Sequence, residues 1–338
     1  MHSRNLAGKS RKGKAEKASR PPNESSADGY HYSKDACFPK NDSVQRPRRA
    51  LFAAAISPAL AKTEKLDLPG ARAEIYKKAS GDDLYLYIFD PEGHDASKKK
   101  LPAIVFFFGG GWTGGTATQF EPRARYLAKR VMITICADYR VQSRQKTSPK
   151  ECVADGKSAI RWVRANADRI GIDTTHIAAG GHVAAAAGMV DGMDDPADEN
   201  TSVSSKLNAL VLFNPVYDNG PGGYGNDRVK EWFPLISPAH NISKDDPPAI
   251  VFLSTKDNLI PVATAEKFKA DMEAAGLKSE LHLYEGQQHG FFNESKGGTE
   301  FFLDTLRKTD AFLVALGYLK CSADEAAMKA VSKGNGKD

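Results

Sequence analysis

The chain has 338 residues, of which 41% are hydrophobic and 26% are charged, as in a globular protein that is large enough to bury its own core. The formal net charge is +5, but the excess of Lys and Arg lies in residues 1–50, and the rest of the chain is mildly acidic. A nucleic-acid partner is therefore not expected, because nucleic-acid binding needs a basic face on the folded part of a protein.

The N-terminal region is expected to stand apart from the folded domain. Residues 1–45 have almost no aliphatic side chains, which predicts a disordered, basic and polar extension. Residues 46–61 combine arginines, a short apolar run and an Ala-x-Ala pattern, the three parts of a secretory signal peptide. Because such a signal starts a chain, export to the periplasm or the medium requires translation to begin near Val44. The alternative is a cytoplasmic protein with a short apolar helix or an unstructured lead-in at 46–61. No stretch reaches the roughly 20 apolar residues of a membrane-spanning helix.

From residue 66 onward, apolar runs alternate with helical periodicities. Runs without polar alternation, such as "AIVFFF", predict strands that are buried on both faces of a parallel sheet. Apolar residues that recur every three or four positions predict helices. In chain order, we predict a strand pair over 71–91, strands near 103–108, 131–140, 175–181, 207–216, 247–254 and 279–285, and helices near 120–131, 148–171, 182–190, 262–276 and 297–319.

This alternation predicts one α/β domain over 66–318, with a mostly parallel sheet that is covered by helices on both faces. Residues 319–338 are polar and are expected to form a frayed C-terminal tail. In such sheets, ligands bind at the carboxyl ends of the strands. The loops of interest are therefore those that follow strands, at 109–118, 180–182, 214–226, 255–260 and 286–292.

Three of these loops carry residues that acyl-transfer chemistry uses. The sequence "FGGGW" places Gly109, Gly110 and Gly111 after a strand, where backbone N–H groups can stabilise an oxyanion. Asp257 and His289 follow two consecutive strands, and a carboxylate in that position can orient an imidazole that acts as a base. Each feature alone is as common in structural roles. Their joint occurrence, with Asp before His, is the chain order of the second and third triad members in α/β-hydrolases.

The chain resembles the α/β-hydrolase superfamily, and within it the lipase/esterase group related to hormone-sensitive lipase and to feruloyl and acetyl-xylan esterases. The resemblance covers about 70–318 and is carried by "FFFGGGW", "ADYR", "DGKSAIRWVRANADRIGID", "HIAAGG", "STKDNLIP" and "EGQQHGFF". It implies an eight-stranded, mostly parallel sheet and hydrolysis of short-chain or carbohydrate-linked carboxylic esters, with no metal and no organic cofactor. It implies that His289 is the general base, that Asp257 is its partner, and that the three glycines form part of the oxyanion hole. Relatives carry His where this chain has Phe108.

The family's nucleophile is expected in "HIAAGGHVAAAAG", where none is found. Relatives read approximately I-A-A-G-G-G-S-A-G-G-H-x-A-A, so the Ser and its neighbours are missing around Gly180, Gly181 and His182. Either the two glycines alone reverse the chain in a tight turn, or the first turn of the following helix unwinds to supply the link. Substitutes are poor, because Thr174 and Thr175 begin the strand at the wrong end of the sheet and His182 is expected to be structural.

Two functions of different classes follow. The first is a serine-type carboxylic ester hydrolase by descent, inactive or severely impaired as written, because loss of a triad Ser costs on the order of 10⁶ in kcat. The second is a catalytically dead protein that binds a small-molecule ligand in the old cleft. A thiol hydrolase is a weaker third hypothesis, because Cys136 lies within a predicted strand and Cys152 at a helix start, both away from the glycine turn.

Overall fold

The computed structural model describes residues 64–198 and 201–333. The expected N-terminal extension (1–45) and the signal-like segment (46–61) lie outside the described residues, and so does the start position near Val44. No helix in the described part of the chain is long and apolar enough to cross a membrane.

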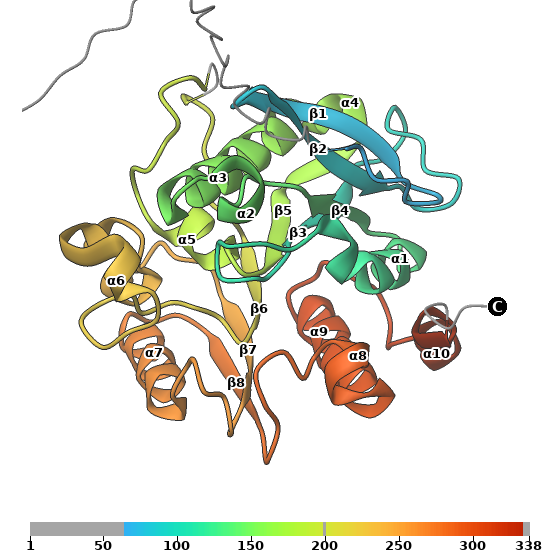
Figure 1. The fold of residues 1–338 in the computed structure, drawn as a ribbon. Helices are drawn as coiled ribbons and strands as arrows, with labels where there is room; N and C mark the ends of the chain where they lie inside the picture. Colours follow the sequence, from blue (N-terminus) through green and yellow to red (C-terminus); the bar gives the residue numbers. More distant parts are fainter. Residues whose placement is uncertain (1–63, 199–200, 334–338) are drawn as a thin grey trace, which may run out of the picture. The chain divides into compact units, whose positions relative to one another are not determined.

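The domain is built on one eight-stranded sheet with the strand order β1-β2-β4-β3-β5-β6-β7-β8 (Figure 1). Strand β2 runs antiparallel to both β1 and β4, and every other neighbouring pair is parallel. The predicted mostly parallel sheet is therefore confirmed. The strands are β1 (Arg72–Ala79), β2 (Asp82–Phe89), β3 (Leu101–Phe107), β4 (Ile133–Ala137), β5 (Ile172–Gly181), β6 (Ala209–Phe213), β7 (Ala249–Ser254) and β8 (Ser279–Tyr284).

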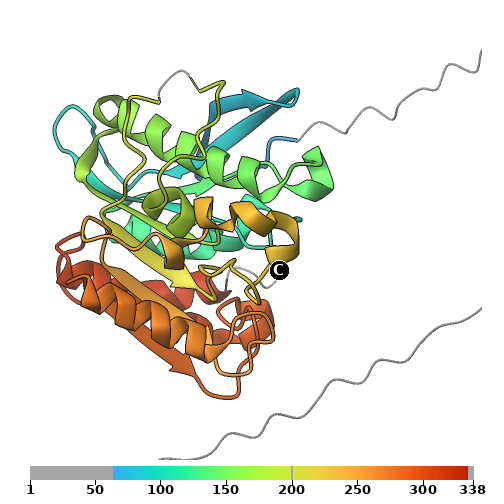
Figure 2. The same ribbon diagram turned by 90° about the vertical axis from the view of Figure 1, so that its left-hand side faces the viewer.

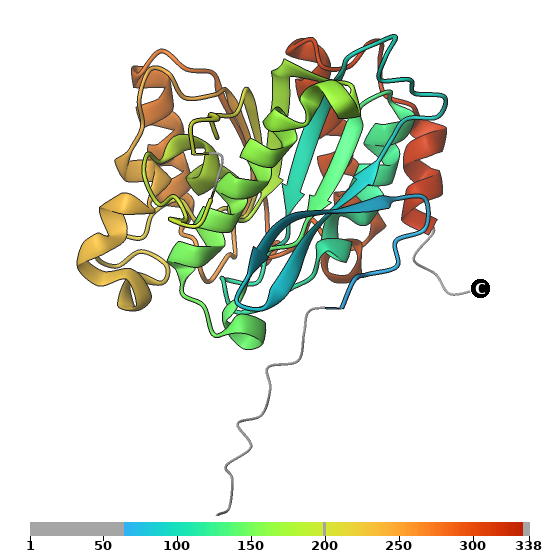
Figure 3. The same ribbon diagram turned by 90° about the horizontal axis from the view of Figure 1, so that it is seen from above.

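Burial along the strands follows their place in the sheet. Every residue of the central strands β4, β6 and β7 is buried, because helices cover both faces there. Edge strand β1 is mostly part-exposed and joins β2 through a two-residue turn (Figure 3). Both turn residues, Ser80 and Gly81, have positive φ, as a type I′ hairpin turn requires.

Helices cover the two faces in the expected alternating order. Helices α3, α5 and α7 lie on one face, seen from the front in Figure 2, and α1, α9 and α10 lie on the other. The helices and 3₁₀ turns are η1 (Ala117–Phe120), α1 (Glu121–Lys129), α2 (Gln142–Gln145), α3 (Pro149–Ala165), α4 (Ala167–Ile170), α5 (Ala184–Met189), α6 (Asn226–Val229), η2 (Lys230–Leu235), η3 (Pro238–His240), α7 (Val262–Ala274), α8 (Glu294–Gly297), α9 (Thr299–Ala315) and α10 (Glu325–Lys333).

Helix α3 begins where the sequence predicts. Ser148 caps it in a capping box with Glu151, and Pro149 occupies the first turn. The predicted helix over 148–171 is divided in the structure, since α3 ends at Ala165 and the short α4 follows before Gly171.

The C-terminal region differs from the frayed tail that its polar composition predicts. Residues 325–333 form α10, which packs against α1 and α9. Met328 is fully buried and Val331 nearly so, and their spacing of three residues places both on one face of the helix. The expectation was wrong because two apolar side chains on one helix face suffice to attach a mostly polar segment to an existing core.

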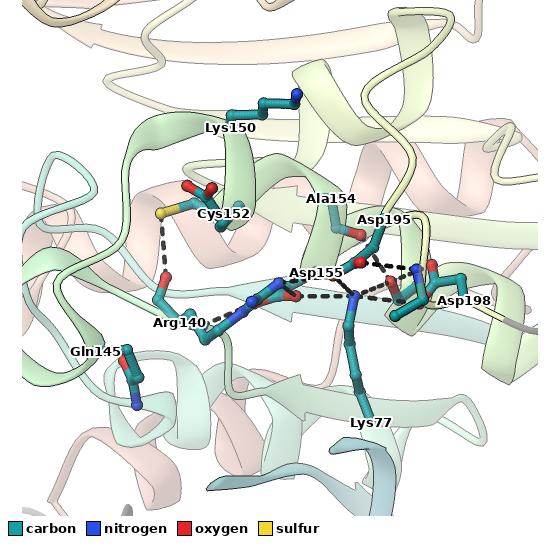
Figure 4. A network of polar contacts seen from close by, with 12 residues as sticks. Lys77, Arg140, Gln145, Lys150, Cys152, Ala154, Asp155, Asp195 and Asp198 are labelled. Carbon is teal, nitrogen blue, oxygen red and sulfur yellow. Dashed lines mark hydrogen bonds and ion pairs between the residues drawn. The ribbon is translucent and has the colours of Figure 1, made fainter. Parts of the chain in front are cut away.

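A buried ionic network ties edge strand β1 to α3 and to the segment after α5 (Figure 4). Lys77 Nζ lies 2.8 Å from Asp195 Oδ2 and 3.1 Å from carboxylate oxygens of Asp155 and Asp198. The Nη2 atom of Arg140 lies 2.7 Å from Asp155 and 2.9 Å from Asp195. Each buried charge therefore has a partner, as burial of charge requires.

Candidate functional site

Most of the residues singled out at the strand ends line one cavity of about 210 Å³, which we call the cleft, whereas Asp257 and Gly180 do not line it. It lies at the carboxyl ends of β3, β5, β6 and β8, the edge at which parallel sheets bind ligands. The cleft is lined by Gly109, Gly110, Gly111, Gln119, Phe120, Gly181, His182, Phe213, Asn214, Val216, Tyr224, Leu259, His289, Gly290, Phe292, Asn293 and Lys296.

His289 and Asp257 form the pair that their chain order predicts. His289 Nδ1 donates a hydrogen bond of 2.9 Å to Asp257 Oδ2. The Asp257 side chain is fully buried, whereas that of His289 is 32% exposed. Asp257 Oδ1 also accepts from the backbone N–H groups of Leu259 and Ile260. Burial by itself raises the pKa of Asp257, but the bonds from His289 and the two N–H groups outweigh it and hold that pKa below its usual value. An ionised carboxylate so placed leaves His289 Nε2 as the basic nitrogen.

Asn214 supports this pair and was not identified from the sequence. Its Nδ2 donates to Asp257 Oδ2 at 2.6 Å, and its Oδ1 accepts from the backbone N–H of Gly290 at 3.1 Å. Asn214 thereby joins the end of β6 to the loops that carry the Asp and the His. It has a φ of 41°, uncommon for a residue other than glycine. The only sequence signal was its position, as the first residue of the loop after a buried strand.

The glycine loop after β3 offers two free donors. Gly109 is not one of them, because its N–H donates to Gln119 Oε1 at 2.5 Å. The N–H groups of Gly110 and Gly111 have no acceptor among the described residues. Both have positive φ, and a Cβ would overlap the carbonyl of Gly114 at the first and the hydroxyl of Tyr224 at the second. The structure thus narrows the predicted donors from three glycines to two.

The expected glycine turn at the end of β5 is not formed. Gly180 and Gly181 stay in the sheet and pair with β3, opposite Phe106 and Phe107, and His182 N–H donates to the Phe107 carbonyl at 3.0 Å. The chain bends only at His182 and the next residue, directly before α5. The structure forms the second of the two predicted links, since α5 begins only at Ala184 and pairing with β3 satisfies the backbone groups of both glycines, which a turn would have left exposed.

His182 is partly buried and lines the cleft. Its ring packs edge-on against Trp112, with the ring centroids 5.1 Å apart. Burial, with smaller contributions from the charges of His289 and Arg228, lowers the pKa of His182 to about 3. Its Nε2 has no hydrogen-bond partner in the described residues. His182 is therefore neutral at physiological pH, in keeping with the expected structural role.

No described residue that lines the cleft carries an aliphatic hydroxyl, a thiol or a carboxylate. Thr174 and Thr175 lie near the start of β5, at the opposite edge of the sheet. Cys136 and Cys152 are buried away from the cleft, and burial raises the pKa of both thiols far above the usual value. Cys321 is exposed near the C-terminus. Among the described residues, no three His, Cys, Asp or Glu side chains are grouped so that they could hold a metal ion.

Comparisons with known proteins agree with this geometry. The BD-FAE family matches residues 86–219, and the dienelactone hydrolase family matches residues 216–331. The chain is 40% identical to esterase 2 of Thermogutta terrifontis in its apo form, with a TM-score of 0.72 over 76% of this chain and 98% of that one. A structure of the same esterase phosphorylated by paraoxon is 41% identical, with a TM-score of 0.71.

Curated relatives are more distant. Esterase LipC of Mycobacterium tuberculosis is 29% identical over 58% of this chain and 55% of its own length. The isoprenylcysteine alpha-carbonyl methylesterase ICME of Arabidopsis thaliana is 28% identical over 64% of this chain and 56% of its own. The chain thus spans a little over half the length of the curated relatives it matches.

Proposed function

We propose, from the premise that this chain belongs to the esterases of the α/β-hydrolase superfamily, that its cleft is a carboxylic-ester site that has lost its nucleophile. The observation that carries the proposal is the composition of the cleft, where the base, its carboxylate and two oxyanion donors meet without a Ser, Thr or Cys. The substrate class is an ester with a short acyl group, because a cavity of about 210 Å³ holds only a few carbon atoms beside the ester.

The retained groups have defined parts in the family's reaction. His289 Nε2 would take the proton of an attacking hydroxyl, and Asp257 would stabilise the imidazolium that forms. The N–H groups of Gly110 and Gly111 would bind the carbonyl oxygen as it becomes an oxyanion. The alcohol would then leave with the proton held by His289. Without a Ser, the attacking hydroxyl is that of a water molecule, which adds to the acyl carbon as His289 takes its proton.

We expect this water reaction to be slow. Removing the nucleophile of a serine protease costs about 10⁶ in kcat, and what remains comes from the oxyanion donors and substrate binding. The missing residues also include the one after the Ser, whose N–H is a further oxyanion donor in this fold. The chain as written is therefore an inactive or severely impaired hydrolase.

A second candidate, a non-catalytic binding protein, is favoured by the cleft itself. The cavity remains open and two backbone donors in it are unpaired, although no nucleophile is present. Structures of the Thermogutta esterase include propionate- and butyrate-bound forms. We propose that small acyl compounds of this size bind here without being turned over.

Rebuilding the missing turn tests the proposal. Inserting Gly-Ser-Ala-Gly-Gly after Gly181 restores the pattern of the relatives, and the matched control inserts Gly-Ala-Ala-Gly-Gly. We expect p-nitrophenyl acetate turnover near background for the chain as written and for the control, and a gain of at least about 10³-fold for the Ser insertion. Mass spectrometry should show a paraoxon adduct on the Ser insertion only.

Two further results would bear on the loss of the nucleophile. Rapid turnover by the unaltered chain that His289→Ala abolishes would contradict the proposal. Resequencing the gene across codons 176–188 is the simplest check, since a Ser found there would make the protein an ordinary esterase.

A further inference from the structure

Three cationic side chains surround the cleft, each from a different part of the chain. Lys296, on α8, lines the cleft directly. Arg228, on α6, donates from Nη1 to the Gly111 carbonyl at 2.6 Å and lies over the Trp112 ring. Arg123, on α1, is buried behind the aromatic wall.

Arg123 sits directly against the rings that line the cleft. Its guanidinium lies 4.9 Å from the centroid of the Phe213 ring and 5.6 Å from that of Phe292. It donates to the Phe292 carbonyl at 2.6 Å and to the Thr305 hydroxyl at 3.0 Å. Burial lowers the pKa of Arg123 to about 9, so the side chain is still protonated at neutral pH.

Nearby acids offset these charges only in part, since the Glu294 carboxylate interacts electrostatically with Arg123. Within residues 64–198 and 201–333, none of the three cations forms an ion pair with a carboxylate. The described cleft lining holds no Asp or Glu, and the buried Asp257 carboxylate lies behind His289 as its hydrogen-bond partner. Glu294 lies two residues before Lys296, but it does not line the cleft. The described lining of the cleft therefore carries the Lys296 charge without an opposing carboxylate, although the domain as a whole is mildly acidic, and such a charge attracts anions.

Lys296 is the cation that a ligand can reach. Its side chain is exposed and folds over Gly290, so that a Cβ on Gly290 would lie 3.1 Å from the Nζ atom. This places the ammonium group close to Gly290, the residue after His289, and both residues line the cleft together with Gly110 and Gly111. A ligand whose ester carbonyl meets the glycines can thus present a second group to Lys296.

We propose that the cleft selects esters that also carry a free carboxylate, such as half-esters of short dicarboxylic acids, and that Lys296 determines this specificity. The inference rests on the proposed function for the ester end of the ligand. The carboxylate would bind the Lys296 ammonium at the mouth of the cleft, where an ionic contact is shielded less by water than on an open surface. A neutral diester of the same length loses that contact.

Calorimetric titration of the unaltered protein tests this preference. We expect monomethyl succinate to bind at least about tenfold more tightly than dimethyl succinate at neutral pH and low salt, a difference of about 1.4 kcal/mol. Lys296→Met should abolish the difference, and Lys296→Arg should keep most of it. Lys244→Met is the matched control, because Lys244 is exposed but precedes β7 and so lies at the opposite edge of the sheet. Raising the salt concentration should narrow the preference.

Equal binding of the two compounds, or an unchanged preference in Lys296→Met, would overturn the inference. Either result leaves the loss of the nucleophile standing, since that is tested separately by turnover of a neutral ester. If the unaltered protein instead hydrolyses both compounds rapidly, the loss of the nucleophile is refuted. The ratio of kcat/KM for the two compounds then tests the role of Lys296 in the same variants.

Discussion

The imidazole of His289 and the carboxylate of Asp257 form a 2.9 Å hydrogen bond in which the acid is fully buried and the imidazole is about one-third exposed. The buried partner is held by donors from three segments, and the exposed partner faces the cleft. A polar arrangement of this kind keeps its geometry whether or not a nucleophile is present.

Asp257→Asn should lower the free energy of unfolding at pH 7, because an amide in this place turns an NH₂ group toward donors such as Leu259 N–H. The pKa of Asp257 is lower in the folded state than its unfolded value of about 3.8. The ionised carboxylate therefore stabilises the fold above pH 3.8, and this stabilisation is lost as the pH falls through the folded-state pKa. The free energy of unfolding, measured with denaturant between pH 7 and pH 2, should fall less steeply with decreasing pH in the variant than in the wild type. Asp245→Asn, at an exposed position, is the control and should leave the acid loss unchanged.

His182→Phe should make the protein more resistant to acid. The pKa of His182 falls from 6.5 to about 3 on folding, so the neutral ring contributes stability above pH 6.5 that is lost as the pH falls toward 3. At pH 4 the loss amounts to about 3 kcal/mol, and the Phe variant should not show it. At pH 7 the change should be small, because His182 Nε2 makes no hydrogen bond to the described residues.

The measurement is the free energy of unfolding at pH 7 and pH 4. The control is His176→Asn, on β5, where the histidine side chain is 36% exposed. Identical acid sensitivity of wild type and His182→Phe would show that His182 is not held neutral by burial.

Gly181→Ala should be among the most damaging small substitutions in the domain. Gly181 has a φ of 94°, and a Cβ would overlap the Phe107 carbonyl in the neighbouring strand. The carbonyl belongs to backbone that cannot move without breaking the pairing of β3 and β5. Gly276→Ala is the matched control, since Gly276 has a φ of 82° but open space around it. We expect the control to cost about 1–2 kcal/mol and Gly181→Ala to cost clearly more. Thermal unfolding of both variants checks this, and equal losses would contradict it.

Lys77→Met should destabilise the domain by about 3 kcal/mol, because it leaves the Asp195 and Asp198 carboxylates without their shared ammonium. Lys78→Met removes a neighbouring charge that is 77% exposed and 3.6 Å from Asp83, so it should change stability by less than about 0.5 kcal/mol. Urea unfolding of the two variants makes the comparison. A small loss in Lys77→Met would mean that Arg140 and Arg161 suffice to neutralise the cluster.

The sequence predicted most of the local elements and the strand ends at which the candidate site residues lie. Short apolar runs such as "ALVLF", flanked by predicted helices, indicate buried strands. The Asp and the His follow β7 and β8, and they lie close together because neighbouring parallel strands end at the same edge of the sheet. The sequence also shows directly that residues 176–188 contain no Ser. The C-terminal helix was missed because its attachment depends on a core surface that no local pattern reveals.

What the sequence determined by itself is therefore the order of elements, the edge of the sheet where the site lies, and the residue types present there. Only the tertiary structure decided how these residues are used. In the structure, Gly181 pairs with β3 within the sheet, the Gly109 N–H donates to Gln119 Oε1, and Asn214 Nδ2 donates to Asp257 Oδ2. The reason is physical, since local periodicity fixes which face a residue takes, whereas strand register and the packing of distant side chains fix which atoms meet.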